Sequence, residues 1–163
     1  MIIRVLLLLA LIAPSMAAWS SPLAAVFASD LIMARSHEKF PEAMLTLQTS
    51  IKEHGYTVAR VQRIDIGLTG MGYKTDKYRV VFVGKKEEIQ YLTKKYPELT
   101  AYMPPKVSIF AEDDDTVIVT ANPGIYKQMV ADDKDKEIFD RWENDVYSVF
   151  KDFSSATIGK CEI

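Results

Sequence analysis

The chain has little of what disulfide-stabilised or metal-binding domains use. Its 163 residues contain one cysteine, Cys161, and two histidines, His37 and His54. A lone cysteine cannot form an internal disulfide, and without a neighbouring cysteine or histidine it is a poor metal ligand. We therefore interpret Cys161 as a tail residue without a special role or, if the chain is exported, as half of an intermolecular disulfide.

An excess of charge of one sign is also missing. The 20 basic residues are scattered among 22 acidic ones, and the formal net charge is −2. Nucleic-acid-binding domains carry a basic patch or stripe, so we expect no nucleic-acid partner. Hydrophobic residues make up 48% of the chain and charged residues 26%, which is typical of a folded globular domain.

The N-terminus contains the longest apolar run, and that run is short. One basic residue, Arg4, precedes the run Val5–Ala13, and small residues follow. A bilayer span needs about 20 residues, whereas this order is typical of a secretory signal. Cleavage after Ala17 or after Ala28 fits the small residues there. We expect residues 1–28 to be a signal peptide or an uncleaved N-terminal anchor, and the protein to be periplasmic or secreted.

The remaining residues, 29–163, predict a single α+β domain. Strand-like segments lie at 30–36, 56–66, 78–84, 106–111 and 116–121. Helical periodicity covers 40–54, 85–96, a short stretch at 122–130 and a long one at 131–153. This pattern predicts an antiparallel or mixed sheet of about five strands covered on one side by helices, in the order β-α-β-β-α-β-β-α with a long C-terminal helix.

Four consecutive acidic residues, Glu112–Asp115, separate the last two predicted strands. Consecutive carboxylates do not fit a calcium loop of the EF-hand type, whose ligands alternate over about 12 residues. They also lack the concave site that acid catalysis needs. Aspartate is common in turns, so we interpret this segment as a hairpin turn. On the flanking strands, the alternation predicts a buried face made of Val107, Ile109, Ala111, Val117, Val119 and Ala121.

The long C-terminal helix is predicted to carry a continuous apolar stripe. Its members are Ile138, Trp142, Val146, Val149, Phe150 and Phe153. Such a stripe packs against the domain's own sheet more often than against a partner. We expect the first arrangement here.

No set of residues in the chain has the spacing of a known catalytic or metal site. Gly67, Gly70 and Gly72 match neither the dinucleotide fingerprint nor the P-loop, and we expect a loop there. His37 and His54 flank one predicted helix about 20 Å long, which separates them too far to share a metal. We therefore expect no catalytic residue, no metal site, no cofactor and no enzymatic activity.

Three segments resemble one known family. They are "FPEAMLTLQTSIKEHGYTV", "YRVVFVGKKEEIQYLTKKYPEL" and "MPPKVSIFAEDDDTVIVTANP", and in this order they are similar to the domain of unknown function 302 (DUF302) family. The resemblance implies an α+β domain with an antiparallel sheet covered on one side by helices, often as a homodimer. It implies no established reaction.

The chain departs from this family where many relatives carry cysteines. These places follow the central strand and precede the hairpin, and here they read Gly84-Lys85-Lys86 and Met103-Pro104-Pro105. A thiol or metal role cannot be carried over to this chain.

An aromatic group is the remaining candidate for a ligand or partner surface. It consists of Tyr91, Tyr96, Tyr102, Met103 and, on the last helix, Trp142. Apolar side chains with a few polar atoms are typical of ligand pockets, although the edge of the core or a dimer contact explains the same residues.

These observations favour an exported, non-enzymatic domain that binds or assembles proteins, as a homodimer or in an envelope complex. Membrane contact is expected only through an uncleaved N-terminal segment. The alternative is a carrier of a small apolar ligand or haem near Tyr102 and Met103, with Met129 or His37 as axial ligand. An enzyme of unrecognised type is the third hypothesis.

Overall fold

The computed structural model describes residues 30–155 of the chain. The predicted export segment, residues 1–28, and Cys161 lie outside this range. Among the described residues, no helix combines the length and apolarity that crossing a membrane requires.

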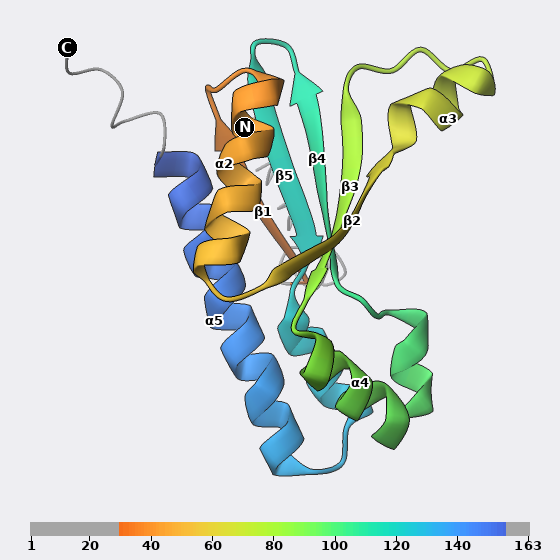
Figure 1. Ribbon diagram of the computed structural model, residues 1–163, viewed down its shortest axis with the longest axis vertical. Helices are drawn as coiled ribbons and strands as arrows, with labels where there is room; N and C mark the ends of the chain where they lie inside the picture. Colours follow the sequence, from red (N-terminus) through yellow and green to blue (C-terminus); the bar gives the residue numbers. More distant parts are fainter. Residues whose placement is uncertain (1–29, 156–163) are drawn as a thin grey trace, which may run out of the picture.

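Strands and helices follow one another in the predicted order, with one α-helix and one 3₁₀ helix added (Figure 1). The strands are β1 Leu31–Ser36, β2 Thr57–Arg63, β3 Tyr78–Gly84, β4 Lys106–Glu112 and β5 Asp115–Ala121. The α-helices are α2 Phe40–Glu53, α3 Ile64–Gly70, α4 Lys86–Lys95 and α5 Asp133–Ser155. Two 3₁₀ helices, η1 Pro97–Ala101 and η2 Pro123–Met129, complete the described elements.

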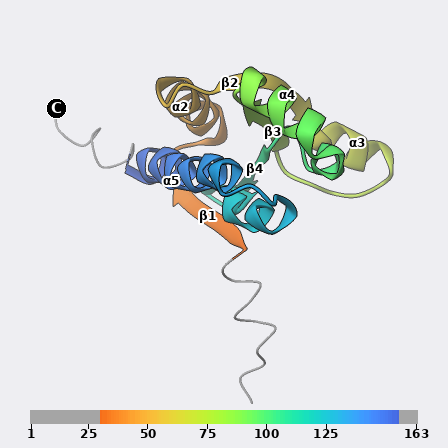
Figure 2. The same cartoon turned by 90° about the horizontal axis from the view of Figure 1, so that it is seen from below.

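The strands form one sheet in the order β1-β5-β4-β3-β2, and every neighbouring pair is antiparallel. The antiparallel form of the prediction is therefore confirmed, and the mixed form does not occur in the described sheet. Helices α2 and α5 lie side by side on one face of the sheet (Figure 2). The α+β architecture with a long C-terminal helix is confirmed as well.

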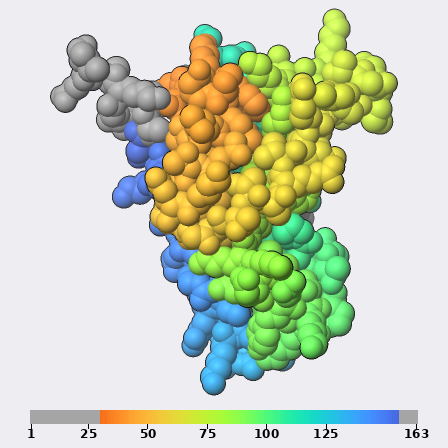
Figure 3. Space-filling model, in the orientation of Figure 1, coloured from red at the N-terminus to blue at the C-terminus, as the bar shows by residue number. Residues whose placement is uncertain are grey.

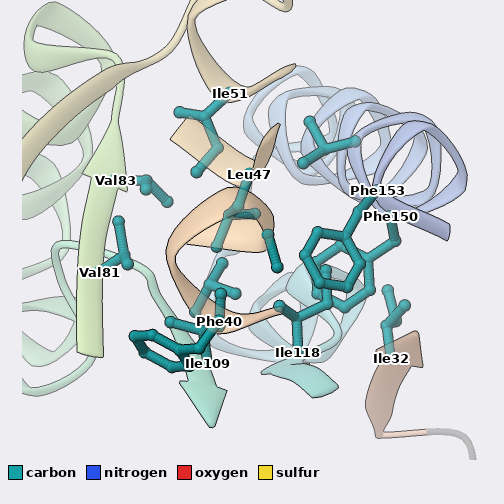
Figure 4. Close-up of a cluster of buried hydrophobic side chains, with 13 residues drawn as sticks. Ile32, Phe40, Leu47, Ile51, Val81, Val83, Ile109, Ile118, Phe150 and Phe153 are labelled. Carbon is teal, nitrogen blue, oxygen red and sulfur yellow. The ribbon is translucent and has the colours of Figure 1, made fainter. Parts of the chain in front are cut away.

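The main core lies between that face of the sheet and helices α2 and α5. Helix α2 contributes its single apolar face, and α5 contributes the last three members of its predicted stripe (Figure 4). The buried members from the helices are Phe40, Ala43, Leu47, Ile51, Val149, Phe150 and Phe153. The strands contribute Ile32, Val81, Val83, Val107, Ile109 and Ile118. The predicted packing of α5 on the sheet is confirmed.

A second, smaller core lies between α4, η1, η2 and the first half of α5. Its buried members are Leu92, Leu99, Tyr126, Val130, Phe139 and Trp142. Tyr56, which precedes β2, packs against both cores. Its hydroxyl donates to the Asp145 carboxylate at 2.7 Å, and the Lys85 ammonium lies 4.5 Å from the centre of its ring. Tyr56 therefore joins the two cores.

The end of β2 differs from the prediction. The strand was expected to continue to Ile66, and a loop was expected around Gly67 and Gly70. Instead the strand ends at Arg63 and residues Ile64–Gly70 form helix α3. Because Arg63 pairs with Arg79 near the start of β3, the residues after Arg63 have no neighbouring strand. A helix then satisfies their backbone groups within the segment.

The buried face of β5 also differs from the prediction. Val117, Val119 and Ala121 were expected to face the core. The register pairs Ile109 with Ile118 and Val107 with Thr120, so Ile118 faces the helices and Val119 faces away from them. Residues 116–120 are all β-branched, and an uninterrupted run of this kind does not reveal which alternate side chains are buried.

The opposite surroundings of two leucines on α2 provide a test of this packing. Leu47 is 0% exposed, whereas Leu45 is 67% exposed. We expect Leu47→Ala to lower the free energy of unfolding by about 2–5 kcal/mol, because it removes buried methyl groups and leaves a cavity. Leu45→Ala should change it by less than about 0.5 kcal/mol. Chemical denaturation followed by circular dichroism measures both, and equal losses would contradict the orientation of α2.

Candidate functional site

The sheet face opposite to α2 and α5 carries apolar side chains that these two helices do not cover. We call it the open face. Its apolar side chains are Leu31, Met33, Val117, Val119, Phe110, Tyr78, Val80 and Phe82. None of them belongs to either core, which shows that the helices pack against one side of the sheet alone.

The strand register places these side chains in rows across the sheet. One row runs from Met33 through Val119 and Ser108 to Val80. The neighbouring row runs through Val117, Phe110 and Tyr78, and the rings of Phe110 and Tyr78 meet edge to face with centroids 6.2 Å apart. The exposure is greatest at the edge strand β1, where Met33 is 62% exposed. A flat apolar surface of this kind is typical of protein contacts.

Two hollows lie on the open face. The first has a volume of about 330 Å³, and its lining includes Leu31, Tyr102, Val119 and Tyr126. The second has a volume of about 530 Å³ and is lined on one side by Phe110 and on the other by the segment Lys74–Tyr78. Both combine apolar side chains with polar ones, such as Ser108. The open face therefore has relief that a partner or a ligand can fill.

The aromatic group expected from the sequence divides between this surface and the second core. Tyr102 lines the first hollow, and Tyr91 is exposed on α4. Tyr96 and Met103 are partly buried against the second core.

The assignment of Trp142 to a surface needs correction. This side chain is 1% exposed, and its indole N–H donates to Glu88 at 2.6 Å. It stacks edge to face on Phe139 within the second core. Trp142 therefore has a structural position and cannot contact a partner directly.

The acidic run forms the predicted turn between β4 and β5. Glu112 pairs with Asp115, and Asp113 takes a positive φ of 54°, a backbone conformation that aspartate tolerates in turns. Three basic groups contact the carboxylates. Arg35 pairs with Glu112 and Asp115, and Lys39 lies 2.6 Å from Asp114. The Nδ1 atom of His37 lies 2.7 Å from Asp115.

These contacts explain the electrostatics of the turn without a metal. The hydrogen bonds from His37 and then from Arg35 lower the pKa of the Asp115 carboxyl group below its usual value. Within residues 30–155, no group of three or more histidine, cysteine, aspartate or glutamate residues is arranged to hold a metal ion.

The second histidine has a similar partner at the other end of α2. His54 Nε2 lies 2.9 Å from the Asp152 carboxylate, which also accepts a hydrogen bond from Ser50 at 2.9 Å. Because both groups bind Asp152, the serine hydroxyl is not held by the imidazole as a nucleophile would be. The contact joins α2 to α5, and we interpret it as structural.

The sequence reasoning missed Leu31 and Met33 as surface residues. Both lie in the first strand, where they alternate with Ile32 and Ala34 on the core side. That alternation was visible in the sequence, but it does not tell which of two apolar sets is buried. The burial follows from the contact of β1 with α5.

Comparison with known proteins gives one family and one fold. Residues 32–152 match the family described as "Domain of unknown function DUF302". The crystal structure of an uncharacterized conserved DUF302 protein from Bacillus stearothermophilus superimposes with a TM-score of 0.66. It is 18% identical, over 75% of this chain and 96% of that chain. At this identity the likeness shows the fold alone. No curated protein matches the chain.

Because of the ion pairs in the turn, the free energy of unfolding should change with pH in the acidic range. Since the pKa of Asp115 is lowered in the folded state, its carboxylate stabilises the fold above the usual pKa of aspartate, and this stabilisation disappears as the pH falls through the folded-state pKa. We expect Asp115→Asn to unfold more easily than the wild type at neutral pH. The difference should vanish in strong acid. Denaturation curves across this pH range measure it.

Asp114→Asn is the matched control for this experiment. The Asp114 side chain is 95% exposed and its pair with Lys39 is in solvent, so the substitution should change stability little. A difference between Asp115→Asn and the wild type that persists unchanged in acid would contradict the role of the carboxylate.

Proposed function

The chain belongs to the DUF302 family, and within it we propose an exported, non-enzymatic domain that self-associates or joins an envelope complex through its open face. The single observation that carries this proposal is the apolar sheet face without a covering helix. One row runs from Met33, which is 62% exposed on the edge strand, through Val119 and Ser108 to Val80, which is 9% exposed on β3.

A second copy of the chain is the partner that suits this face. Two sheets pack face to face by placing apolar rows against each other, with the strands of the two sheets within about 30° of one another. The hollows beside Tyr102 and Phe110 leave room for side chains of the other sheet. A stable interface needs about 800 Å² from each partner.

The carboxylates support a structural rather than a catalytic interpretation. Five of them have a lowered pKa, and a basic or histidine side chain hydrogen-bonds to each: Asp65 with Arg79, Asp115 with His37, Asp132 and Asp135 with Lys95, and Asp152 with His54. A general acid or base for neutral pH needs the opposite shift in a carboxyl group. The ionised groups therefore serve ion pairs between elements.

A small apolar ligand is the second candidate, because Tyr102 lines a hollow of about 330 Å³. Ligand pockets begin at about 300 Å³. His37 does not suit an axial ligand there. It contacts the turn after Glu112, whereas the hollow lies at Lys106, and the strand between these residues spans about 20 Å. Native mass spectrometry of protein purified from its own source tests this function. The wild type should carry a bound molecule, and the Tyr102→Ala variant should lack it.

The main test of the assembly function uses two substitutions at equally exposed positions. Met33 on the open face is 62% exposed and Leu45 on α2 is 67% exposed, so neither replacement by glutamate should unfold the domain. We expect Met33→Glu to raise the dissociation constant of the dimer more than about tenfold, because a charge would be buried between two sheets. Leu45→Glu should leave it unchanged.

Sedimentation equilibrium over a range of protein concentrations measures both constants. A wild-type protein that stays monomeric throughout and captures no envelope protein would contradict the proposal. So would a Met33→Glu variant that associates as well as the wild type.

The export proposal has its own test. Removal of the signal should give a mature protein that begins at Ala18 or Ser29, following the two small-residue sites. N-terminal sequencing of protein purified from its own source identifies the first residue. An intact Met1 would contradict cleavage and favour the uncleaved anchor.

A further inference from the structure

The segment between β2 and β3 projects from the body of the domain. It comprises α3 and the following residues up to Lys77, and we call residues 64–77 the arm. Figure 3 shows it as a protrusion beside the ends of the sheet. Helix α3 has no buried residue. The arm nevertheless contains three apolar or aromatic side chains that are more than half exposed, Ile66, Met71 and Tyr73.

The base of the arm is held firmly while its tip is free of contacts with the core. The Arg79 guanidinium on β3 donates to the Asp65 carboxylate at 2.5 Å, and Arg63 lies 3.6 Å from the same carboxylate. Met71, at the far end of α3, is 73% exposed. Packing within the domain does not account for these exposed apolar side chains. Exposed apolar side chains that gather on one part of a surface are typical of a contact site.

The arm and its base are basic on an acidic protein. The arm itself is neutral, with Lys74 and Lys77 against two acidic residues, and the preceding end of β2 adds Arg60 and Arg63, which gives +2 for residues 60–77 against −2 for the whole chain. Among the described residues, only Arg63 of these four forms an ion pair with a carboxylate. The Asp65 carboxylate is already occupied by Arg79. Lys77 lies 5.9 Å from the centre of the Phe40 ring and lines a hollow with the carboxylates of the acidic turn. The positive charge available to an external partner is therefore that of Arg60 and Lys74.

We propose that the arm docks on an anionic lipid bilayer. Ile66, Met71 and Tyr73 enter the interfacial region of the lipids, and Arg60 and Lys74 face the phosphate groups. Exposed apolar side chains beside basic ones are the combination that binds proteins to membrane surfaces, and tyrosine is enriched at the level of the headgroups. Basic residues near such a surface gain from its negative potential.

This contact is separate from the proposed self-association. It involves the arm, whereas the dimer involves the rows of side chains centred on Met33 and Val119. It is also separate from an uncleaved N-terminal anchor, which would hold the chain near a membrane without orienting the domain. The test therefore has to report on the arm itself.

A tryptophan at the tip of the arm provides that report. In the full chain, Met71→Trp places an indole at the tip, and Leu45→Trp places one at a similarly exposed position on α2 as the matched control. Both variants share the same native tryptophans, Trp142 and, where the N-terminal segment is retained, Trp19, so only the added indole differs. The lipids are vesicles of phosphatidylglycerol with phosphatidylcholine, and vesicles of phosphatidylcholine alone.

With the anionic vesicles, we expect the emission of Met71→Trp to shift to shorter wavelength and to be quenched by brominated lipid. Leu45→Trp should show neither change. Adding Lys74→Glu to Met71→Trp should weaken the effect about tenfold in lipid concentration or more, because a basic residue near the surface contributes about 1 kcal/mol and the substitution reverses its charge. Added salt should weaken it as well.

Three results would overturn the proposal. The first is the absence of a spectral change at Met71→Trp with either lipid. The second is an equal change with neutral and anionic vesicles. The third is a change that appears without lipid and grows with protein concentration, which would assign the arm to contact between copies of the chain. The Met33→Glu result is independent of all three.

Discussion

The turn at Asp113 and Asp114 sets the register on which both faces of the sheet depend. Because Glu112 pairs with Asp115, Ile109 stands beside Ile118 on the core side and Ser108 stands beside Val119 on the other. A shift of one residue would exchange these two sets. Arg35 and His37 hold the turn from the side of β1. The acidic cluster therefore contributes to the fold by fixing geometry.

In that register, apolar side chains lie on both faces of the sheet. One side packs under α2 and α5, and the other carries apolar side chains next to polar ones such as Arg35 and Ser108, with Val80 and Val117 largely shielded by their own neighbours. Antiparallel sheets commonly alternate apolar residues toward the core with polar residues toward solvent. The departure from this pattern on β1, β5 and β3 is the physical basis of the proposed self-association.

Sequence reasoning succeeded where one periodicity dominated a segment. Helix α2 could be predicted because Phe40, Ala43, Leu47 and Ile51 form one face. The faces of β5 could not, because residues 116–120 are all β-branched and the turn geometry decides between them. Helix α3 could not be predicted either. It follows from the absence of a strand opposite Ile64–Ile66, which is a property of the sheet and not of the segment.

The residues of the candidate surface could likewise be predicted only in part. Tyr102 could be found from its aromatic neighbours, and the structure places it at a hollow. Leu31 and Met33 could not be distinguished from core residues, because Ile32 and Ala34 between them are equally apolar. Trp142 was predicted to lie on a surface but is buried. The sequence could not decide this, because a large aromatic residue on an amphipathic helix suits a core as well as an interface.

Tyr56 has a consequence for the motions of the domain. It joins the main core under the sheet to the smaller core that surrounds Trp142. Regions with separate cores can open separately, each with its own free energy. Amide hydrogen exchange should then divide the molecule into two cooperative units, with α4 and η1 exchanging faster than the strands. The hydrogen bond from Tyr56 to Asp145 would determine how strongly the opening of one unit affects the other.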